Sequence, residues 1–430
     1  MPDTIFALSS GAPPAAIAVI RVSGPQAGAA LMALAGRLPP PRRAVLAVLS
    51  DPAGAPLDQG MVLWLPGPGT ATGEDSAELH LHGGRAVVAA VEAALSAVPG
   101  LRRAEPGEFT RRAFANGRID LAEAEGLADL LSAETELQRR GALAMAGGAL
   151  SRLVADWRSR VLALSAAIEA ALDFAGDDEI EDDGALPPGF AQGCALLSDE
   201  LGGWLARPRA EPLREGFRVV LAGPPNAGKS TLFNALVEDE AAITAAEPGT
   251  TRDVLVRAVA LGGVPFAFVD TAGLRDEGAG AIEQIGIARA RAEAERADLV
   301  LWLGPEGEGP VGRTVWEIAA QADRKDIPSK RHARFRVSAV TGQGLAALQA
   351  GLIDHARGAL PQPGAVALNA RQHALLAEVA VATGEAGRCS DALLAAENLR
   401  LARVALDRLV GRAGTEDMLD ALFGRFCIGK

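Results

Sequence analysis

The chain has few of the residues that build disulfide frameworks or zinc sites. Its 430 residues include five histidines and three cysteines, Cys194, Cys389 and Cys427, with no CxxC pair. Because the cysteines are odd in number and widely spaced, neither a disulfide framework nor a zinc site is supported. His80 and His82 have no further identifiable ligand, so we expect them to pack in a strand. A free, functional thiol stays open, whereas Cys194 and Cys389 fit small buried hydrophobes better.

Long apolar runs are also absent. Although 49% of the residues are hydrophobic, no window approaches the roughly 20 uninterrupted apolar residues that span a bilayer. The first residues, MPDTIFALSSG, lack the basic start and apolar stretch of a signal peptide. We therefore expect a soluble, cytoplasmic protein with no membrane partner.

Basic residues are too few to make the chain basic throughout. The net charge is −12 and the isoelectric point is near 5.1, although a local patch can still bind nucleic acid. Composition therefore neither requires nor excludes an RNA partner. The length alone indicates two or three domains.

Apolar patterning divides the chain into sections. Residues 1–117 mix short apolar runs with Gly and Pro and one helical stretch, GRAVVAAVEAALSAV, which is typical of an α+β domain. In residues 118–212, apolar side chains such as Leu150, Val154 and Trp157 recur at steps of three and four and predict helices. The acidic stretch GDDEIEDDGALPPG in this section is expected to be a solvated loop.

Residues 213–362 alternate strand-like and helix-like segments, which predicts a parallel sheet with helices on both faces. The strand-like segments are FRVVLAG, VLVRAVAL, FAFVDTAG, ADLVLWL and ARFRVSA. The helical pattern resumes in residues 363–430. We therefore predict an α/β domain inserted into a helical domain whose two parts pack together.

A phosphate-binding motif opens the inserted section. GPPNAGKS (223–230) fits G-x-x-x-x-G-K-[ST], follows the strand FRVVLA and begins the helix TLFNALV. Its N–H groups can surround phosphate oxygens, Lys229 can reach the β- and γ-phosphates, and Ser230 can ligate Mg²⁺. The Asn226 amide oxygen suits an alkali cation, although an Asn in a turn more often stabilises the turn itself. The predicted nucleotide contacts here are Asn226, Ala227, Gly228, Lys229, Ser230 and Thr231.

Two further segments indicate a GTPase. PGTTRD offers the Thr251 hydroxyl for Mg²⁺, and DTAG (270–273) ends a strand with a carboxylate for the metal shell and a glycine amide for the γ-phosphate. SAVTGQGL is similar to the guanine-contacting loop of that class. The predicted nucleotide contacts in these segments are Ala245, Ala246, Glu247, Pro248, Gly249, Thr250, Thr251, Asp270, Thr271, Ala272, Gly273, Ser338 and Ala339.

Two departures from a Ras-like GTPase stand out. The N-K-x-D signature of guanine-selective proteins is reduced to AQAD (320–323), in which Asp323 can still favour guanine over adenine, while the missing Asn and Lys predict weaker base packing. Leu274 follows DTAG where Ras-like enzymes have a water-orienting glutamine, so catalysis needs another group. The candidates are Arg275, Glu283 and Arg252, each equally compatible with a solvated surface charge.

Motifs outside this section point to a family. They are DTIFALSSG and AVIRVSGP, GEDSAELHLHGG, PGEFTRRAFANGRIDLAEAEGLADL and the final FCIGK. With the inserted GTPase section they span Asp3 to Lys430, and the whole resembles the MnmE (TrmE) family of tRNA-modification GTPases. The resemblance implies a multidomain fold: an N-terminal α+β domain that dimerises and binds a formyl-tetrahydrofolate, a helical domain, and an inserted Ras-like P-loop GTPase domain.

The resemblance also implies an activity. Members act in a heterotetramer-type complex with the FAD-dependent partner MnmG (GidA). They add an aminomethyl or carboxymethylaminomethyl group to carbon 5 of the wobble uridine in certain tRNAs, with the folate as one-carbon source. Potassium stimulates their GTP hydrolysis as two G domains of the homodimer meet.

Site residues carry over from the family by position. Glu283 would position the water, and K⁺ would be held by Asn226, Ala245, Glu247 and Thr250. The residues implied for the folate are Arg21, Glu78, Arg118 and Lys430. The implied role of Cys427 is at the modification site, as nucleophile or as acid/base group.

Two other readings remain open. One is a GTP-dependent assembly switch like Era and Der, in which the nucleotide state sets partner affinity and no covalent product is made. The folate-type N-terminal section and the FCIGK tail argue against it. The other reading, an ATPase, depends only on the degraded AQAD.

Overall fold

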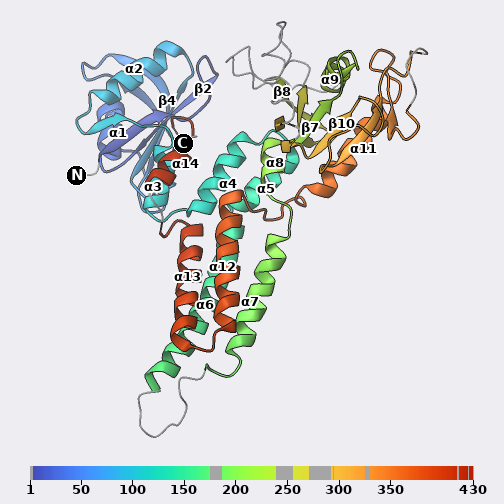
Figure 1. The fold of residues 1–430 in the computed structure, drawn as a ribbon. Helices are drawn as coiled ribbons and strands as arrows, with labels where there is room; N and C mark the ends of the chain where they lie inside the picture. Colours follow the sequence, from blue (N-terminus) through green and yellow to red (C-terminus); the bar gives the residue numbers. More distant parts are fainter. Residues whose placement is uncertain are drawn as a thin grey trace, which may run out of the picture. The chain divides into compact units, whose positions relative to one another are not determined.

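The computed structural model describes residues 3–174, 186–238, 255–270, 292–293, 295–324, 330–413, 416–424 and 426–429. The chain forms two compact units, one of Met1–Ala128 with Leu406–Lys430 and one of Asp129–Ala405. The first unit therefore joins the two ends of the sequence, as the blue and red segments in Figure 1 show.

The first unit is built on a six-stranded sheet of order β3-β4-β5-β2-β1-β6. Its strands are β1 (Thr4–Leu8), β2 (Ile17–Ser23), β3 (Val45–Ser50), β4 (Pro56–Leu65), β5 (Ser76–His82) and β6 (Leu101–Arg103). Neighbouring strands are antiparallel except for β1 and β6. Helices α1 (Ala27–Ala35) and α2 (Arg85–Ser96) supply buried residues to the same core as alternate residues of β2, namely Ala18, Ile20 and Val22. The remaining β2 residues, including Arg21, lie on the other face.

Short helices complete this unit. They are α3 (Glu108–Ala115), the start of α4 (Leu121–Ser132) and α14 (Glu416–Phe423). Phe423 and Phe426 are buried together with Ala124, and the Leu121 N–H donates to the Val410 carbonyl at 3.1 Å. The C-terminal segment is therefore part of the core of the N-terminal unit.

Long helices form one part of the second unit: α5 (Glu136–Ala146), α6 (Ala149–Phe174), α7 (Phe190–Leu205), α12 (Ala370–Arg388) and most of α13 (Ala392–Leu409). In α6, Leu150, Val154 and Trp157 are all at most 1% exposed, which confirms the helical periodicity. Capping boxes begin α5 at Thr135 and α12 at Asn369.

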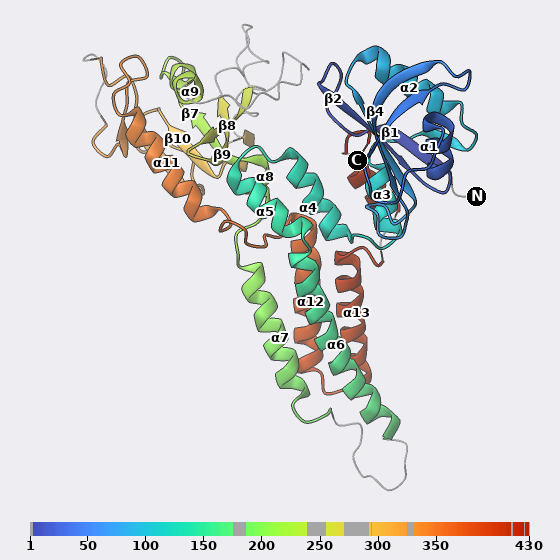
Figure 2. The same ribbon diagram turned by 180° about the vertical axis from the view of Figure 1, so that it is seen from behind.

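Helices α7 and α12 lie side by side in both views (Figures 1 and 2), although more than 160 residues separate them in sequence. Ser198 Oγ donates to the Ala380 carbonyl at 3.0 Å. A Cβ placed on Gly387 would come within 2.7 Å of Cys194 Cβ, so a glycine is needed for this close approach. Burial raises the pKa of the Cys194 thiol to about 11, which suits a packing role.

The other part of the second unit is a six-stranded sheet of order β12-β11-β10-β7-β9-β8. Its strands are β7 (Phe217–Ala222), β8 (Leu255–Leu261), β9 (Val264–Asp270), β10 (Leu299–Trp302), β11 (Val315–Ala319) and β12 (Phe335–Arg336). Helices α8 (Glu211–Glu215), α9 (Lys229–Glu238) and α11 (Leu345–Ala359) accompany it, and α9 and α11 bury residues in the same core as β7 and β9.

Two sequence expectations about this sheet are wrong. Strand β8 pairs antiparallel with β9, because the two-residue turn Gly262-Gly263, with φ of 53° and 76°, closes a hairpin rather than a crossover. The strands predicted from the sequence do not include β11, whose short apolar run VWEIA is interrupted by Glu317. The other neighbouring pairs of the sheet are parallel, as predicted.

The chain enters and leaves the α/β part of this unit at adjoining points. The Ala210 N–H donates to the Leu368 carbonyl at 3.0 Å, and the Ala370 N–H donates to Glu211 Oε1 at 2.5 Å. These bonds hold the segment that enters the α/β part, at Ala210, beside the segment that leaves it, at Leu368. Across the parts of the chain that the structure describes, no helix is both long and apolar enough to cross a membrane.

Candidate functional site

The phosphate-loop motif connects β7 to α9. Lys229 is 7% exposed, and its Nζ donates to the carbonyls of Gly223 at 3.0 Å and Pro224 at 2.8 Å. Gly223 and Gly228 have φ of 151° and 87°, a conformation that side chains disfavour. The loop therefore curls around the Lys229 ammonium group, as a cradle for phosphate requires.

Asp270 and Ser230 lie at the same edge of the sheet. Asp270 ends β9, is 3% exposed and is paired in register with Leu221, just before the phosphate loop. Ser230 is exposed in the first turn of α9. A carboxylate and a hydroxyl are oxygen ligands of the kind that Mg²⁺ prefers, so these residues fit that ion.

The two segments expected to contact the base follow β11 and β12, which β10 separates from β7. AQAD comes directly after β11, and Ser338 comes two residues after β12. The Ala322 N–H donates to the Val337 carbonyl at 3.0 Å. Ser338 is fully buried and its Oγ accepts from the Thr341 N–H at 3.1 Å. Asp323 is exposed, with its side chain accessible to a ligand.

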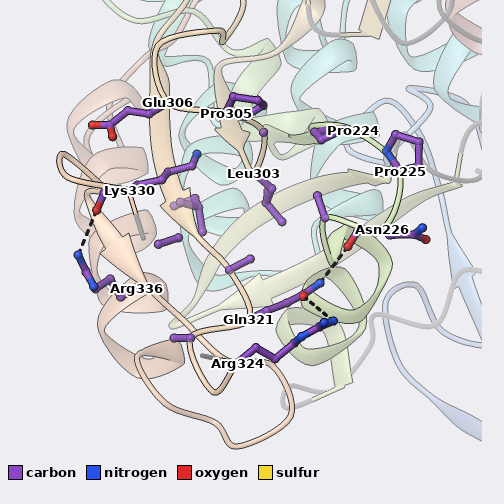
Figure 3. A pocket seen from close by; sticks show the side chains of 16 residues that line it. Pro224, Pro225, Asn226, Leu303, Pro305, Glu306, Gln321, Arg324, Lys330 and Arg336 are labelled. Atoms are coloured by element: carbon purple, nitrogen blue, oxygen red, sulfur yellow. Dashed lines mark hydrogen bonds between the residues drawn. The ribbon is translucent and has the colours of Figure 1, made fainter. Parts of the chain in front are cut away.

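Gln321 connects these segments to the phosphate loop. Its Nε2 donates to the Asn226 carbonyl at 3.0 Å, as the dashed line in Figure 3 shows. The sequence analysis did not predict a role for Gln321 and noted only that the Asn and Lys of the signature are missing. The available signal was the position of Gln321 in AQAD, where the signature has its lysine. A cleft of about 800 Å³ adjoins the contact. Its lining includes Pro224, Pro225, Asn226, Leu303, Pro305, Glu306, Gln321, Arg324, Lys330 and Arg336.

The C-terminal tail is bound to the first unit. Ile428 forms an isolated antiparallel bridge with Pro106, and Ser9 Oγ donates to the Gly429 carbonyl at 2.9 Å. Phe426 is 4% exposed. Between these anchored neighbours, Cys427 is exposed, so its thiol is accessible.

Arg21 and Glu78 lie opposite each other on β2 and β5. Arg21 Nη2 is 3.2 Å from Glu78 Oε1, and His80 Nε2 is 3.1 Å from Glu78 Oε2. Burial raises the pKa of the Glu78 carboxyl, but the His80 hydrogen bond and the Arg21 charge outweigh it and hold the pKa below its ordinary 4.5. His82 bonds instead to Asp58 at 2.8 Å. Arg118 is exposed, with its side chain against Gly73.

Comparison with known proteins identifies the family. Residues 4–118 match the family described as GTP-binding protein TrmE N-terminus, and residues 121–427 match the MnmE helical domain. The tRNA modification GTPase MnmE of Novosphingobium aromaticivorans is 72% identical to this chain, and that of Erythrobacter litoralis is 63% identical, each over 100% of both chains. The chain belongs to the tRNA modification GTPase MnmE family.

Family membership confirms the resemblance, the multidomain fold class and the enzyme class, a GTP hydrolase. The G domain of the T. maritima FeoB iron transporter is also similar, with 25% identity over 32% of this chain and 98% of that chain. Its TM-score is 0.24, which is too low to support an argument.

Several residues expected to be functional in an MnmE protein lie outside the described residues. They are Ala245, Ala246, Glu247, Pro248, Gly249, Thr250, Thr251, Arg252, Thr271, Ala272, Gly273, Arg275, Glu283 and Lys430. Of the residues predicted to bind nucleotide, the structure places the phosphate loop and Asp270 after the paired strands β7 and β9, whereas Asp323 and Ser338 follow β11 and β12, on the other side of β10.

MnmE-type motifs of the first unit also contain an ion network that sequence reasoning missed. Arg112 is within 3.2 Å of carboxylate oxygens from Asp3, Glu74 and Glu108. Glu74 Oε2 in turn accepts from Ser23 Oγ at 2.8 Å. The network ties α3 to the start of the chain and to the GEDS segment before β5. The only available signal was the charge of these motifs, which by itself does not specify partners.

Proposed function

We propose that this chain hydrolyses GTP to support modification of carbon 5 of the wobble uridine in certain tRNAs. It acts in the cytoplasm as a homodimer, in a heterotetramer-type complex with the FAD-dependent partner MnmG (GidA). The product carries an aminomethyl or carboxymethylaminomethyl group, with a formyl-tetrahydrofolate as one-carbon source. The observation that carries this proposal is the bound tail, which holds Cys427 on the same unit as Arg21 and Glu78.

In the nucleotide site, Lys229 supplies a positive charge to the β- and γ-phosphates, while N–H groups from Asn226 to Thr231 surround the phosphate oxygens. Ser230, Thr251 and Asp270 would hold Mg²⁺, and the bound ion would supply positive charge at the phosphate oxygens. Asp270 ends β9 in register with Leu221, the residue before the last of β7, which supports a place for its carboxylate beside the phosphate loop.

Glu283 orients the attacking water, because Leu274 has no hydrogen-bonding group for that role. Arg252 and Arg275 are the further candidates for charge stabilisation. The residues that hold K⁺ are Asn226 through its side-chain oxygen and Ala245, Glu247 and Thr250. In Figure 3 the Asn226 side-chain amide points away from Gln321, and its residue is exposed, which supports a ligand role.

The guanine base is recognised by Asp323, whose carboxylate accepts from the N1–H and the exocyclic amine. Ser338 and Ala339 line the base through their backbone. The buried Ser338 hydroxyl and its bond from the Thr341 N–H support this assignment, because a hydrogen-bonded loop loses less entropy when the base binds.

The folate site comprises Glu78 for the donor edge of the pterin and Arg21, Arg118 and Lys430 for the carboxylates of the glutamate tail. Arg21 donates to Glu78 Oε1 from both Nε and Nη2, and His80 Nε2 bonds to Oε2. Since an ionised carboxyl offers about four acceptor positions, one position of Glu78 remains for a pterin donor. The chemistry of the donor set therefore fits the cofactor.

The domain organisation in this proposal has residues 1–117 as the folate-binding and dimerisation domain and 213–362 as the inserted G domain. Residues 118–212 and 363–430 form the two parts of the helical domain. The hydrogen bond between Ala210 and Leu368 joins the segments before and after the G domain, which supports the insertion of this domain into the helical domain.

Mass spectrometry of tRNA nucleosides tests the function. Cells lacking the protein are complemented with wild type, Cys427→Ser, Lys229→Ala or the control Cys389→Ser, which changes a thiol outside the first unit. We expect wild type and Cys389→Ser to restore the modified wobble uridine and the other two variants to fail. An unchanged nucleoside profile in the deletion strain would contradict tRNA modification and favour an assembly switch.

A further inference from the structure

Gln321 has an uncommon backbone conformation. Within the described part of the chain, three residues other than glycine have positive φ: Arg42 at 58°, Asn226 at 59° and Gln321 at 54°. This left-handed conformation is costly for residues with side chains, and it persists where the surroundings hold it. Two of the three residues are joined by a single hydrogen bond, from Gln321 Nε2 to the Asn226 carbonyl.

The Gln321 side chain contacts the phosphate loop at a second point. A Cβ built on Gly228 would lie 3.0 Å from Gln321 Nε2 and 3.4 Å from its Cγ. The glycine before Lys229 therefore leaves room for this side chain. At the other end of the amide, Oε1 accepts from Arg324 Nη1 at 3.4 Å, so both ends of the Gln321 amide have partners (Figure 3).

The backbone of Gln321 belongs to the segment proposed to contact the base. Asp323 is two residues later, and the intervening Ala322 N–H bonds to Val337, which precedes Ser338. One side chain thus joins the base segment to the phosphate loop across 95 positions of sequence. Tying two parts of a site together before a ligand arrives reduces the entropy lost on binding.

We propose that Gln321 is a positioning residue of the nucleotide site: its side-chain amide locks the phosphate loop, at Asn226 and Gly228, to the segment that carries Asp323. The bond holds Asn226 in its left-handed conformation and so fixes the direction of the N–H groups that follow it. Gln321 occupies the place of the lysine in the signature. At that place its neutral side-chain amide donates the hydrogen bond to the Asn226 carbonyl of the phosphate loop. This inference rests on the proposed nucleotide site.

The test uses full-length Gln321→Met, which keeps the side-chain length and removes the donor. Gln321→Lys restores a donor, and Gln362→Met is the control, because Gln362 is an exposed glutamine outside this cleft. Dissociation of a fluorescent GDP and steady-state GTP hydrolysis are measured together with thermal unfolding. We expect Gln321→Met to release GDP roughly tenfold faster, as the loss of one hydrogen bond implies. Its KM should rise by a similar factor with kcat changed less than about twofold.

Gln321→Lys should recover most of the slow GDP release, and Gln362→Met should behave as wild type. Equal GDP release and KM in wild type and Gln321→Met would overturn the proposal. A fall in kcat and melting temperature with unchanged KM would also overturn it, since that result indicates a structural role alone. Lys229→Ala separates the two hypotheses: if it binds GTP as wild type does, the proposed nucleotide site itself is wrong.

Discussion

Ser9 Oγ donates a hydrogen bond of 2.9 Å to the carbonyl of Gly429, which joins residues 420 positions apart. Chain ends usually fray, but here the bridge from Pro106 to Ile428 and the burial of Phe426 add to this bond. The exposed Cys427 thiol lies between these anchors. The contacts on both sides of Cys427 therefore fix the position of its backbone on the first unit.

Gly429→Ala should release the tail. Gly429 has φ of 96°, and a Cβ there would lie 2.2 Å from the Leu8 carbonyl oxygen. We expect wobble-uridine modification to fall at least about tenfold, because several tail contacts are lost together, while GTP hydrolysis stays within about twofold. Gly11→Ala is the matched control, since a Cβ at Gly11 meets nothing within 4 Å. Normal modification by Gly429→Ala would show that the bound tail is not required.

Asp323→Asn should change the base preference. A carboxylate accepts two hydrogen bonds from guanine, whereas an amide presents one donor and one acceptor and matches xanthine better. We expect GTP affinity to fall by about 100-fold or more and XTP affinity to rise, because the variant amide places its own N–H against one of the two guanine donors. Competition among GTP, XTP and ATP measures this. If GTP still wins over XTP in the variant, Asp323 does not contact the base.

Arg112→Met should destabilise the first unit. The Arg112 side chain is 14% exposed and pairs with Asp3, Glu74 and Glu108. Its loss leaves nearby carboxylates without their cation, and we expect the free energy of unfolding to fall by about 3 kcal/mol. Hydrogen exchange of β1 and β2 amides in the full-length protein measures the change.

Arg103→Met is the control for that experiment. Arg103 is 66% exposed and pairs with Glu92 at 2.8 Å, so we expect a loss under about 1 kcal/mol. Equal effects of the two variants would mean that the Arg112 network contributes no more than a surface pair.

His355 should make the stability of the α/β part depend on pH. The centroid of its ring lies 5.2 Å from the ring centroid of Trp316 and 5.7 Å from that of Phe217. Burial and the Arg334 charge lower the pKa of His355 below its ordinary 6.5. Between the lowered pKa and 6.5 the unfolded chain binds more protons than the folded one, so the free energy of unfolding falls as pH decreases below 6.5.

His355→Phe should flatten this pH dependence, because the aromatic contacts remain and the titrating group is lost. His332→Phe, at an exposed position, is the control and should keep the wild-type slope. Hydrogen exchange of β7 amides across this pH range provides the measurement. A slope unchanged in His355→Phe would assign the effect to another group.

The sequence by itself determined the features that depend on neighbouring residues. The spacing of Leu150, Val154 and Trp157 predicted α6, since a helix buries side chains at steps of three and four. GPPNAGKS predicted the loop between β7 and α9, because its glycines permit φ values that few residues adopt. Local backbone preferences and periodicity suffice for both.

Only the tertiary structure decided which distant groups meet. Glu317 interrupts the apolar run of β11, and the position of this strand depends on pairing with β10. The β8–β9 hairpin, in contrast, follows from the local Gly262-Gly263 turn, a signal that the sequence did contain. Residues far apart in sequence are joined at three places: the bond from Gln321 to Asn226, the Arg112 ion network, and the bond from Ser9 to Gly429 that holds the C-terminal tail. A charge or an amide in the sequence does not specify its partner, because that partner is chosen by packing of the whole sheet and its helices.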